Sequence, residues 1–141
     1  MRVGELMTRY VEFIDGDASV VELAEMMGDL DVGAVPVGSA DALEGIVTDR
    51  DILYRVVAKG LDNKSIRARD ISSQPVIGCG EDDTVQAAMD LMAAHHVRRL
   101  AVRDDAGRVI GWITLSDLAR HLLVESGAVQ SHLREVTEAV E

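Results

Sequence analysis

Residues 45–51 read GIVTDRD and residues 111–117 read GWITLSD, and the interpretation of the whole chain starts from these two stretches. Both follow one pattern: Gly, two large apolar residues, Thr, two variable residues and Asp. The threonines Thr48 and Thr114 are 66 residues apart (114 − 48). A glycine before two apolar residues predicts a buried strand, and the Thr that follows predicts the start of a helix. We call this pattern the repeated motif.

Two interpretations of the motif's Thr and Asp are open. Asp51 and Asp117 are also 66 residues apart (117 − 51), and each follows its threonine by three positions. Thr and Asp side chains commonly cap helices by accepting hydrogen bonds from free backbone N–H groups. Alternatively, such a carboxylate accepts two hydrogen bonds from a vicinal diol such as ribose, while the helix N-terminus favours a nearby anion. Recurrence at equivalent positions strengthens the ligand-binding interpretation.

The duplication extends beyond the motif. Residues 32–37 (VGAVPV) align with residues 97–102 (VRRLAV) at an offset of 65. Ser19 is expected to open one helix, with Glu22 in a capping box, and Thr84 to open its counterpart. Each half therefore predicts the order strand, helix, strand, strand, helix, and internal repeats of this kind form small units that stack on each other.

The predicted fold class is α/β (α+β), with the two halves packed strand face to strand face in pseudo-twofold symmetry. The predicted organisation is residues 1–60 for repeat 1, 61–70 for a linker, 71–123 for repeat 2 and 124–141 for a C-terminal helix.

The first strand of each repeat is the least clear element. Val11 and Phe13 alternate like a brief strand, and Val76-Ile77 is its expected counterpart in the second half. Gly78-Cys79-Gly80 is interpreted as a loop that follows it. In that position Cys79 could be a reactive thiol or form an intermolecular bridge, although no cationic neighbour is evident.

Composition excludes several classes of function. The chain has 141 residues, a formal net charge of −11 and only 3% aromatic residues. Nucleic-acid binding needs a basic face or stacking aromatics, so no nucleic-acid partner is expected, and an anionic membrane surface is equally unsuitable. No apolar run reaches the length of a membrane span or a signal peptide. With Cys79 as the only cysteine, the sequence predicts a soluble protein of the cytoplasm.

Catalytic and metal sites are not expected. His95 and His96 are adjacent on a helix, where their side chains point about 100° apart, and no further ligand has suitable spacing. Ser116, Asp117 and His121 do not form a triad, because Ser116 and His121 are more than one helical turn apart. The sequence therefore predicts neither an enzyme nor a bound metal or other cofactor.

An apolar stripe near the C-terminus has no counterpart in the repeat. Val129, Leu133, Val136 and Val140 recur at helical spacing. Such a stripe either folds back on the core of its own chain or forms a contact between two chains, and the sequence leaves both alternatives open.

The duplicated motif, the strands before it and the capped helices resemble a pair of cystathionine-β-synthase (CBS) domains, also called a Bateman module. The resemblance covers about residues 1–123. The layout is also similar to stand-alone two-repeat bacterial proteins, including those of the actinobacterial hypoxic-response type. The resemblance implies β-α-β-β-α repeats, a homodimer, and regulation of an unidentified protein by AMP, ADP, ATP or S-adenosylmethionine, bound between the repeats.

The same resemblance implies roles for individual residues. Thr48 with Asp51, and Thr114 with Asp117, correspond to the residues that hold the ribose in that family. Backbone groups around Val11 and Val76 correspond to the lining of the adenine pocket, and Arg98 or Arg99 to the group that meets the phosphate. The alternative is a ligand-free homodimeric interaction module.

The first repeat departs from the family pattern. Gly33 and Ala34 stand where Arg98 and Arg99 stand in the second repeat, so the first site lacks these phosphate partners unless Arg50 substitutes for them. We therefore expect two unequal sites, of which the one with Arg98 and Arg99 is the better anion site.

Overall fold

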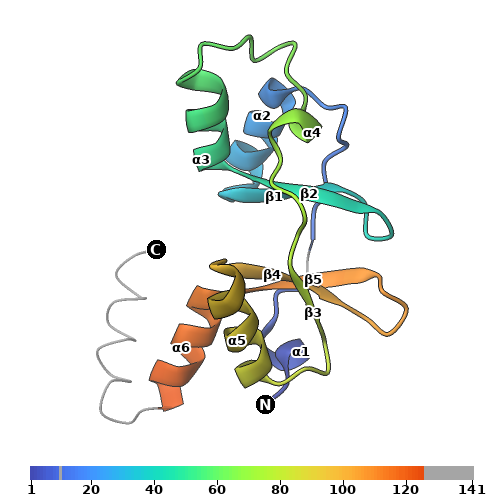
Figure 1. The fold of residues 1–141 in the computed structure, drawn as a ribbon, viewed down its shortest axis with the longest axis vertical. Helices are drawn as coiled ribbons and strands as arrows, with labels where there is room; N and C mark the ends of the chain where they lie inside the picture. Colours follow the sequence, from blue (N-terminus) through green and yellow to red (C-terminus); the bar gives the residue numbers. More distant parts are fainter. Residues whose placement is uncertain (10, 126–141) are drawn as a thin grey trace. The chain divides into compact units, whose positions relative to one another are not determined.

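The computed structural model describes residues 1–9 and 11–125, which form two compact units (Figure 1). The first-motif unit comprises residues 11–76 and 107–110, and the second-motif unit comprises residues 1–9, 77–106 and 111–125. The predicted helix over residues 124–141 falls almost entirely outside the described residues, as does its apolar stripe.

The first-motif unit contains two antiparallel strands and the helices that cover them (Figure 1). Its elements are α2 (Val20–Leu30), β1 (Ala34–Gly38), β2 (Leu43–Thr48), α3 (Asp49–Ile52), the π-helical turn η1 (Leu53–Val57) and α4 (Ala68–Ile71). The turn predicted at residues 38–42 connects β1 to β2, whose register pairs Ala34 with Thr48.

The second-motif unit repeats this arrangement around the sheet order β3-β4-β5. Its elements are α1 (Val3–Leu6), β3 (Gly78–Gly80), α5 (Val85–His95), β4 (Arg99–Arg103), β5 (Val109–Thr114) and α6 (Leu115–Glu125), although the first residues of β5 are grouped with the other unit. The order from β3 to α6 is the predicted β-α-β-β-α, so the mixed α/β (α+β) class is confirmed.

The strands predicted at Val11 and Val76-Ile77 are misplaced. In the first-motif unit the residue that pairs is Ile14, which forms a parallel bridge with Val37, and in the second it is β3, where Cys79 pairs with Val102. The pair Cys79–Val102 is the repeat counterpart of the pair Ile14–Val37, because both residues lie 65 positions later (79 − 14 and 102 − 37). The alternation of apolar residues suggested a strand at Val11. The segment instead pairs at Ile14, whose N–H donates to the backbone oxygen of Pro36 and whose backbone oxygen accepts from the N–H of Gly38.

The helix starts agree with the capping signals, although at α2 only the Ser19 half of the predicted capping box with Glu22 is formed. Ser19 Oγ accepts from the N–H of Glu22 at 3.2 Å, and Thr84 Oγ1 accepts from the N–H of Ala87 at 3.1 Å. At the other ends, Asp31 and His96 both adopt left-handed backbone conformations with φ of 54°. A left-handed residue is a common helix terminator, so His96 has a structural role.

Each unit has its own apolar core, with its largest side chains fully buried. The core of the first-motif unit consists of Ile14, Val20, Leu23, Met27, Val35, Val37, Val47, Val56, Ala68 and Ile71. In the second-motif unit the buried set includes Val3, Met7, Ala88, Met92, Leu100, Val102, Ile113 and Leu118. Aliphatic side chains and methionine fill both cores, as expected for a chain with 3% aromatic residues.

The strand of each motif pairs with a short segment from another part of the chain. Thr8 and Trp112 exchange two backbone hydrogen bonds of 2.8 and 2.9 Å, and Ser73 and Ile46 exchange two of 2.8 and 3.2 Å. The N-terminal segment therefore belongs with the second motif, and the segment after α4 belongs with the first motif.

The motif glycines make this pairing possible. A Cβ on Gly111 would lie 2.5 Å from the backbone oxygen of Thr8, and a Cβ on Gly45 would lie 2.8–2.9 Å from Ser72 Oγ and the Ser73 oxygen. No side chain larger than hydrogen fits at these distances, so the first residue of the motif is determined by close backbone approach.

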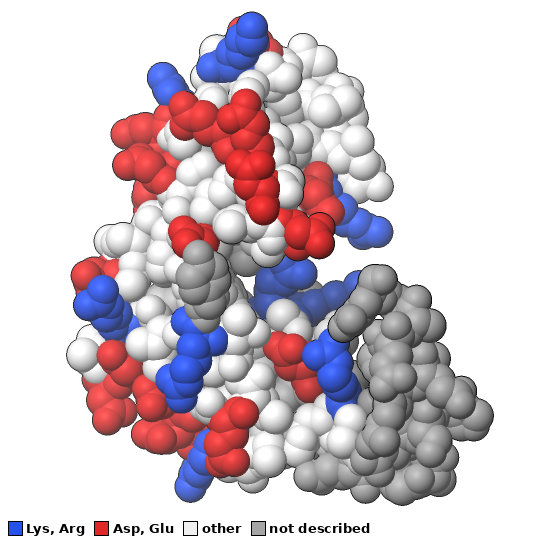
Figure 2. Space-filling model, turned by 180° about the vertical axis from the view of Figure 1, so that it is seen from behind, with Lys and Arg blue, Asp and Glu red and all other residues white. Residues whose placement is uncertain are grey.

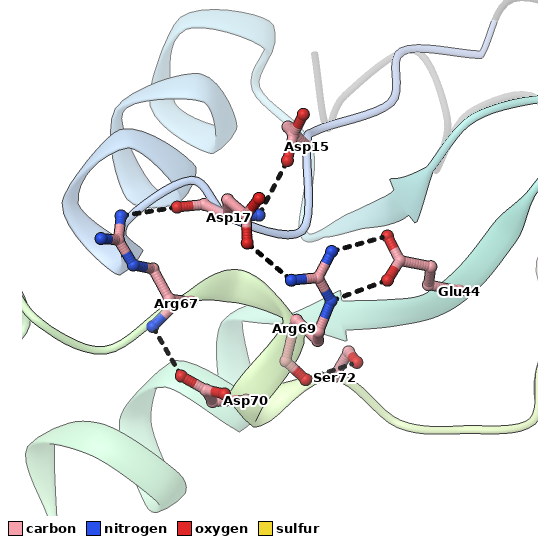
Figure 3. Close-up of polar contacts among 7 residues, drawn as sticks. All are labelled: Asp15, Asp17, Glu44, Arg67, Arg69, Asp70 and Ser72. Carbon is pink, nitrogen blue, oxygen red and sulfur yellow. Dashed lines mark hydrogen bonds and ion pairs between the residues drawn. The ribbon is translucent and has the colours of Figure 1, made fainter.

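An ion-pair cluster attaches α4 to the first-motif unit (Figure 3). Arg69 donates to Glu44 Oε1 at 2.8 Å and to Asp17 Oδ1 at 2.6 Å, while Arg67 donates to the backbone oxygen of Asp17 at 2.7 Å. Hydrogen bonds to Glu44 and then Asp17 raise the pKa of the Arg69 guanidinium, which stays charged. The counterpart of Arg67 in the N-terminal segment is Arg2 (67 − 65), which donates to the backbone oxygen of Asp82 at 2.6 Å, so this contact recurs in the other unit. The counterpart of Arg69 is Gly4 (69 − 65), so among the described residues the ion pairs of Arg69 have no equivalent there.

Cys79 lies in the middle of β3 and is buried, so the predicted loop at Gly78-Cys79-Gly80 is wrong. The three residues pair with Ala101, Val102 and Arg103 of β4. Burial, and secondarily the charge of Asp83, raises the pKa of Cys79 to about 11. A thiolate is the reactive form of cysteine, so this environment favours an inert thiol.

We predict that Gly111→Ala destabilises the protein by about 2–3 kcal/mol, because the added methyl overlaps the Thr8 carbonyl. The matched control is Gly28→Ala in α2, where a Cβ meets nothing within 4 Å and a gain of about 0.5–1 kcal/mol is expected. Urea unfolding of the two variants measures the expected loss and the expected gain in the free energy of unfolding. A Gly111→Ala protein as stable as wild type would contradict the assigned role of the glycine.

We predict that Cys79 in the folded protein reacts with Ellman's reagent at pH 8 at least about tenfold more slowly than in the protein unfolded by guanidinium. The pKa of Cys79 is about 11 in the folded protein, above the ordinary value of 9.0. The neutral thiol therefore stabilises the folded state relative to the unfolded one, and this stabilisation is fully present below pH 9.0. This stabilisation is lost as the pH rises through the pKa of the folded protein, about 11. Cys79→Ala, which removes the only thiol, is the blank, and rapid labelling of the folded protein would refute the prediction.

Candidate functional site

The Thr and Asp of each motif form a reciprocal pair of hydrogen bonds. In the first motif the N–H of Thr48 donates to Asp51 Oδ2 at 2.8 Å, and the N–H of Asp51 donates to Thr48 Oγ1 at 3.2 Å. In the second, Thr114 and Asp117 make the same bonds at 3.0 and 3.1 Å. The capping interpretation is confirmed in both motifs, and we call each arrangement a Thr–Asp box.

Capping leaves part of each box available. It uses one carboxylate oxygen and one lone pair of the hydroxyl, so the second oxygen of the aspartate and the hydroxyl proton are not consumed. The side chains are partly accessible, with 15% of Asp51 and 21% of Asp117 exposed. An acceptor beside a donor is the chemistry that a vicinal diol requires, so capping and diol binding are compatible.

An arginine faces the second oxygen of each aspartate. Arg55 Nε lies 3.6 Å from Asp51 Oδ1, and Arg120 Nη1 lies 4.0 Å from Asp117 Oδ1. Arg55 also donates to the backbone oxygen of Ile71 at 2.8 Å, which holds it in place. Neither arginine was predicted from the sequence, although helical spacings of four residues from Asp51 to Arg55 and three from Asp117 to Arg120 were a usable signal.

Arg98 and Arg99 lie beside the second Thr–Asp box. The N–H of Leu115, the residue after Thr114, donates to the backbone oxygen of Arg98 at 2.7 Å, and Arg99 is the first residue of β4. Within residues 1–9 and 11–125, neither guanidinium has an ion-pair partner. Figure 2 shows that acidic and basic side chains are interspersed over the described surface seen in that view.

The first box has different neighbours at the equivalent positions. The N–H of Asp49 donates to the backbone oxygen of Gly33 at 3.0 Å, so the same backbone contact is present without an arginine. Asp49 Oδ1 accepts from the N–H of Arg50 at 2.8 Å, and the Arg50 side chain is exposed. Only the backbone of Arg50 makes this contact, so its predicted part at the box stays a prediction, and the carboxylate of Asp49 is a neighbour that was not predicted from the sequence.

The remaining predicted site residues are not linked to a box by the described contacts. Val11 and Val76 are half-buried in segments without helix or strand. Their proposed part in an adenine pocket stays a prediction. Among the described residues, no group of three or more His, Cys, Asp or Glu side chains could hold a metal ion, and no helix could span a membrane.

An apolar groove of about 350 Å³ lies in the first-motif unit between α2 and the α3–η1 helix. Its lining consists of Val20, Val21, Ala24, Glu25, Ile52, Val56, Val57 and Asn63. Neither Thr48 nor Asp51 lines this groove, so it is separate from the Thr–Asp box.

Comparison with known proteins agrees with the duplicated architecture. The sequence model of the CBS domain matches twice, at residues 3–58 and 68–124. Hypoxic response protein 1 of Mycobacterium tuberculosis is 31% identical over 119 residues, which cover 84% of this chain and 82% of that protein. An uncharacterized protein of Methanopyrus kandleri is 39% identical over 117 residues, or 82% of this chain, which spans 60% of that protein's length.

A solved structure shows the same fold. The CBS domain protein of Pyrobaculum aerophilum in complex with AMP superposes with a TM-score of 0.73 at 27% identity, covering 96% of this chain and 99% of that one. The two sequence matches, the two Thr–Asp boxes and the β-α-β-β-α order all agree. This chain belongs to the CBS domain family and is a tandem CBS pair, a class of regulatory ligand-binding module.

Proposed function

We propose that this CBS pair senses an adenosine compound (AMP, ADP, ATP or S-adenosylmethionine) and regulates another protein without catalysing a reaction. The observation that carries the proposal is the repeated Thr–Asp box, which keeps a carboxylate oxygen and a hydroxyl available in both motifs. The AMP complex of the Pyrobaculum aerophilum relative supports an adenosine ligand.

In this proposal each box binds the ribose of one ligand. Asp51 and Asp117 accept hydrogen bonds from the two hydroxyls, while Thr48 and Thr114 contribute their own hydroxyl groups. Binding displaces the weak contact with the neighbouring arginine, which is 3.6 Å in one box and 4.0 Å in the other.

The other predicted residues complete the two sites. Arg98 and Arg99 neutralise the phosphate at the second box. At the first box, Arg50 is the only one of these three arginines. Guanidinium groups suit this role because they pair with phosphate through two parallel hydrogen bonds. Backbone groups around Val11 and Val76 line the base pocket.

Regulation follows from differential binding. A ligand shifts the population of two packing states only by the difference in its affinity for them. We place the protein in the cytoplasm and divide the chain into residues 1–60, 61–70, 71–123 and 124–141, as the sequence suggests.

We predict that AMP, ADP, ATP or S-adenosylmethionine at about 1 mM raises the melting temperature of the wild type, and that the double variant Asp51→Asn/Asp117→Asn loses the shift. Saturation at 100 times the dissociation constant stabilises by about 2.7 kcal/mol, or roughly 5–10 °C. Asparagine keeps a capping oxygen, whereas alanine would cost about 1 kcal/mol for each lost cap.

The matched control is Asp29→Asn/Asp105→Asn, which makes the same change of charge at one exposed position in each unit. This control should respond to ligand like wild type. If no compound shifts the folded wild type, or if the box variant responds fully, the ribose assignment is wrong.

A second candidate function is a ligand-free homodimeric interaction module. Helical turns after the first motif expose large apolar side chains, including Tyr54 at 58% and Val57 at 64%, together with Leu53 and Leu61. Val57 also lines the apolar groove beside α2. Contiguous exposed apolar surface of this kind is typical of protein interfaces, so we propose that a second copy covers it.

We predict that Val57→Glu converts a homodimer to a monomer in sedimentation velocity at about 10–100 µM, because a buried unpaired carboxylate is costly in an apolar interface. Ala42→Glu, at an exposed position in the turn between β1 and β2, is the control and should remain dimeric. A monomeric wild type, or a dimeric Val57→Glu variant, would exclude this face as the dimer contact.

A further inference from the structure

The two Thr–Asp boxes differ most at two positions beside them. Gly33 in the first-motif unit corresponds to Arg98 in the second (98 − 33 = 65), and Asp49 corresponds to Leu115 (115 − 49 = 66). The first box therefore has an acidic residue where the second has an apolar one, and a glycine where the second has an arginine.

In each unit the two positions are in contact through a backbone hydrogen bond. Asp49 N–H donates to the Gly33 oxygen at 3.0 Å, and the N–H of Leu115 donates to the oxygen of Arg98 at 2.7 Å. This backbone contact is thus shared by the two units, and the side chains at its two ends differ.

The Asp49 carboxylate lies over Gly33. A Cβ built on Gly33 would be 3.4 Å from Asp49 Oδ2 and 3.9 Å from Oδ1. In the second-motif unit the side chain of Arg98 leaves the backbone from this same position. A carboxylate therefore lies beside the first box next to the position from which the Arg98 side chain extends in the second.

The charges around the two boxes do not balance in the same way. The first has Asp49, Asp51, Arg50 and Arg55, two of each sign. The second has Asp117 with Arg98, Arg99 and Arg120, which leaves two positive charges in excess. Among the described residues, Arg98 and Arg99 have no acidic partner.

Resting on the proposed adenosine-binding function, we infer that the two boxes take different classes of ligand. The box of Thr114 and Asp117 binds a phosphorylated adenosine compound. The box of Thr48 and Asp51 binds one whose tail is uncharged or cationic, such as adenosine or S-adenosylmethionine, and Asp49 is the residue that excludes phosphate. Arg50 offsets the Asp49 charge but leaves no positive excess for a phosphate.

Full-length single-box variants test this inference one site at a time. Asp117→Asn leaves the first box, and Asp51→Asn leaves the second. Calorimetric titration of each variant with AMP and with adenosine gives the preference of the remaining box. The Asp51→Asn variant should bind AMP at least about tenfold more tightly than adenosine, whereas the Asp117→Asn variant should bind adenosine at least as tightly as AMP.

Salt provides an independent readout. Attraction between exposed charges weakens as ionic strength rises. Raising sodium chloride from about 50 to 300 mM should weaken AMP binding to Asp51→Asn several-fold and should not weaken AMP binding to Asp117→Asn. The fluorescence of Trp112, the only tryptophan and part of the second motif, should change with AMP in Asp51→Asn but not in Asp117→Asn.

The decisive variant adds Asp49→Leu to Asp117→Asn, which gives the first box the residue found in the second. AMP affinity should rise about fivefold and adenosine affinity should change far less. Asp29→Leu in the same background changes the charge equally at an exposed position of α2 and should leave the preference as it was.

The failure of this inference is distinguishable from failure of the proposed function. If wild type binds neither AMP nor adenosine, the proposed function fails and the inference fails with it. If wild type binds both, but the single-box variants share one preference or Asp49→Leu changes AMP and adenosine alike, only the inference is overturned.

Discussion

The reciprocal hydrogen bonds of the Thr–Asp box are the interaction on which the rest of each unit depends. They end a buried strand and begin a helix within one residue, so the helix must leave the sheet at a set point. The first helical N–H then reaches back to the residue before the neighbouring strand, Gly33 in one unit and Arg98 in the other. The box thereby orients its own aspartate and also determines which side chains stand beside it.

This shared backbone explains how one duplicated motif produces two chemically different sites. The hydrogen bonds that hold the box involve main-chain atoms and two side chains, so the positions between and beside them are free to vary. Asp49 and Leu115 occupy the same place in the two boxes, as do Gly33 and Arg98. The two units differ in charge at these positions while both keep the capping bonds, so the local electrostatics can vary while the fold is retained.

Much of the fold could be predicted from local patterns, and the errors have a common cause. Ser19, Thr84 and the two motifs marked helix starts because a capping bond spans only three residues. The first strand of each repeat was misplaced at Val11 and Val76, since a short apolar alternation does not identify its partner. At the site, the box residues were predictable from their spacing, whereas the carboxylate of Asp49 over Gly33 required the paired backbone.

The sequence by itself determined the duplication, the β-α-β-β-α order, the helix caps and the acidic residues of the two boxes, because each is encoded by residues close together in the chain. Tertiary structure alone decided that Thr8 pairs with Trp112 and Ser73 with Ile46, that Ile14 forms the bridge to β1, and that Cys79 lies in β3. Those choices depend on satisfying buried backbone groups across long sequence separations. The same long-range pairing explains why both motifs begin with glycine, since the crossing backbone leaves no room for a Cβ.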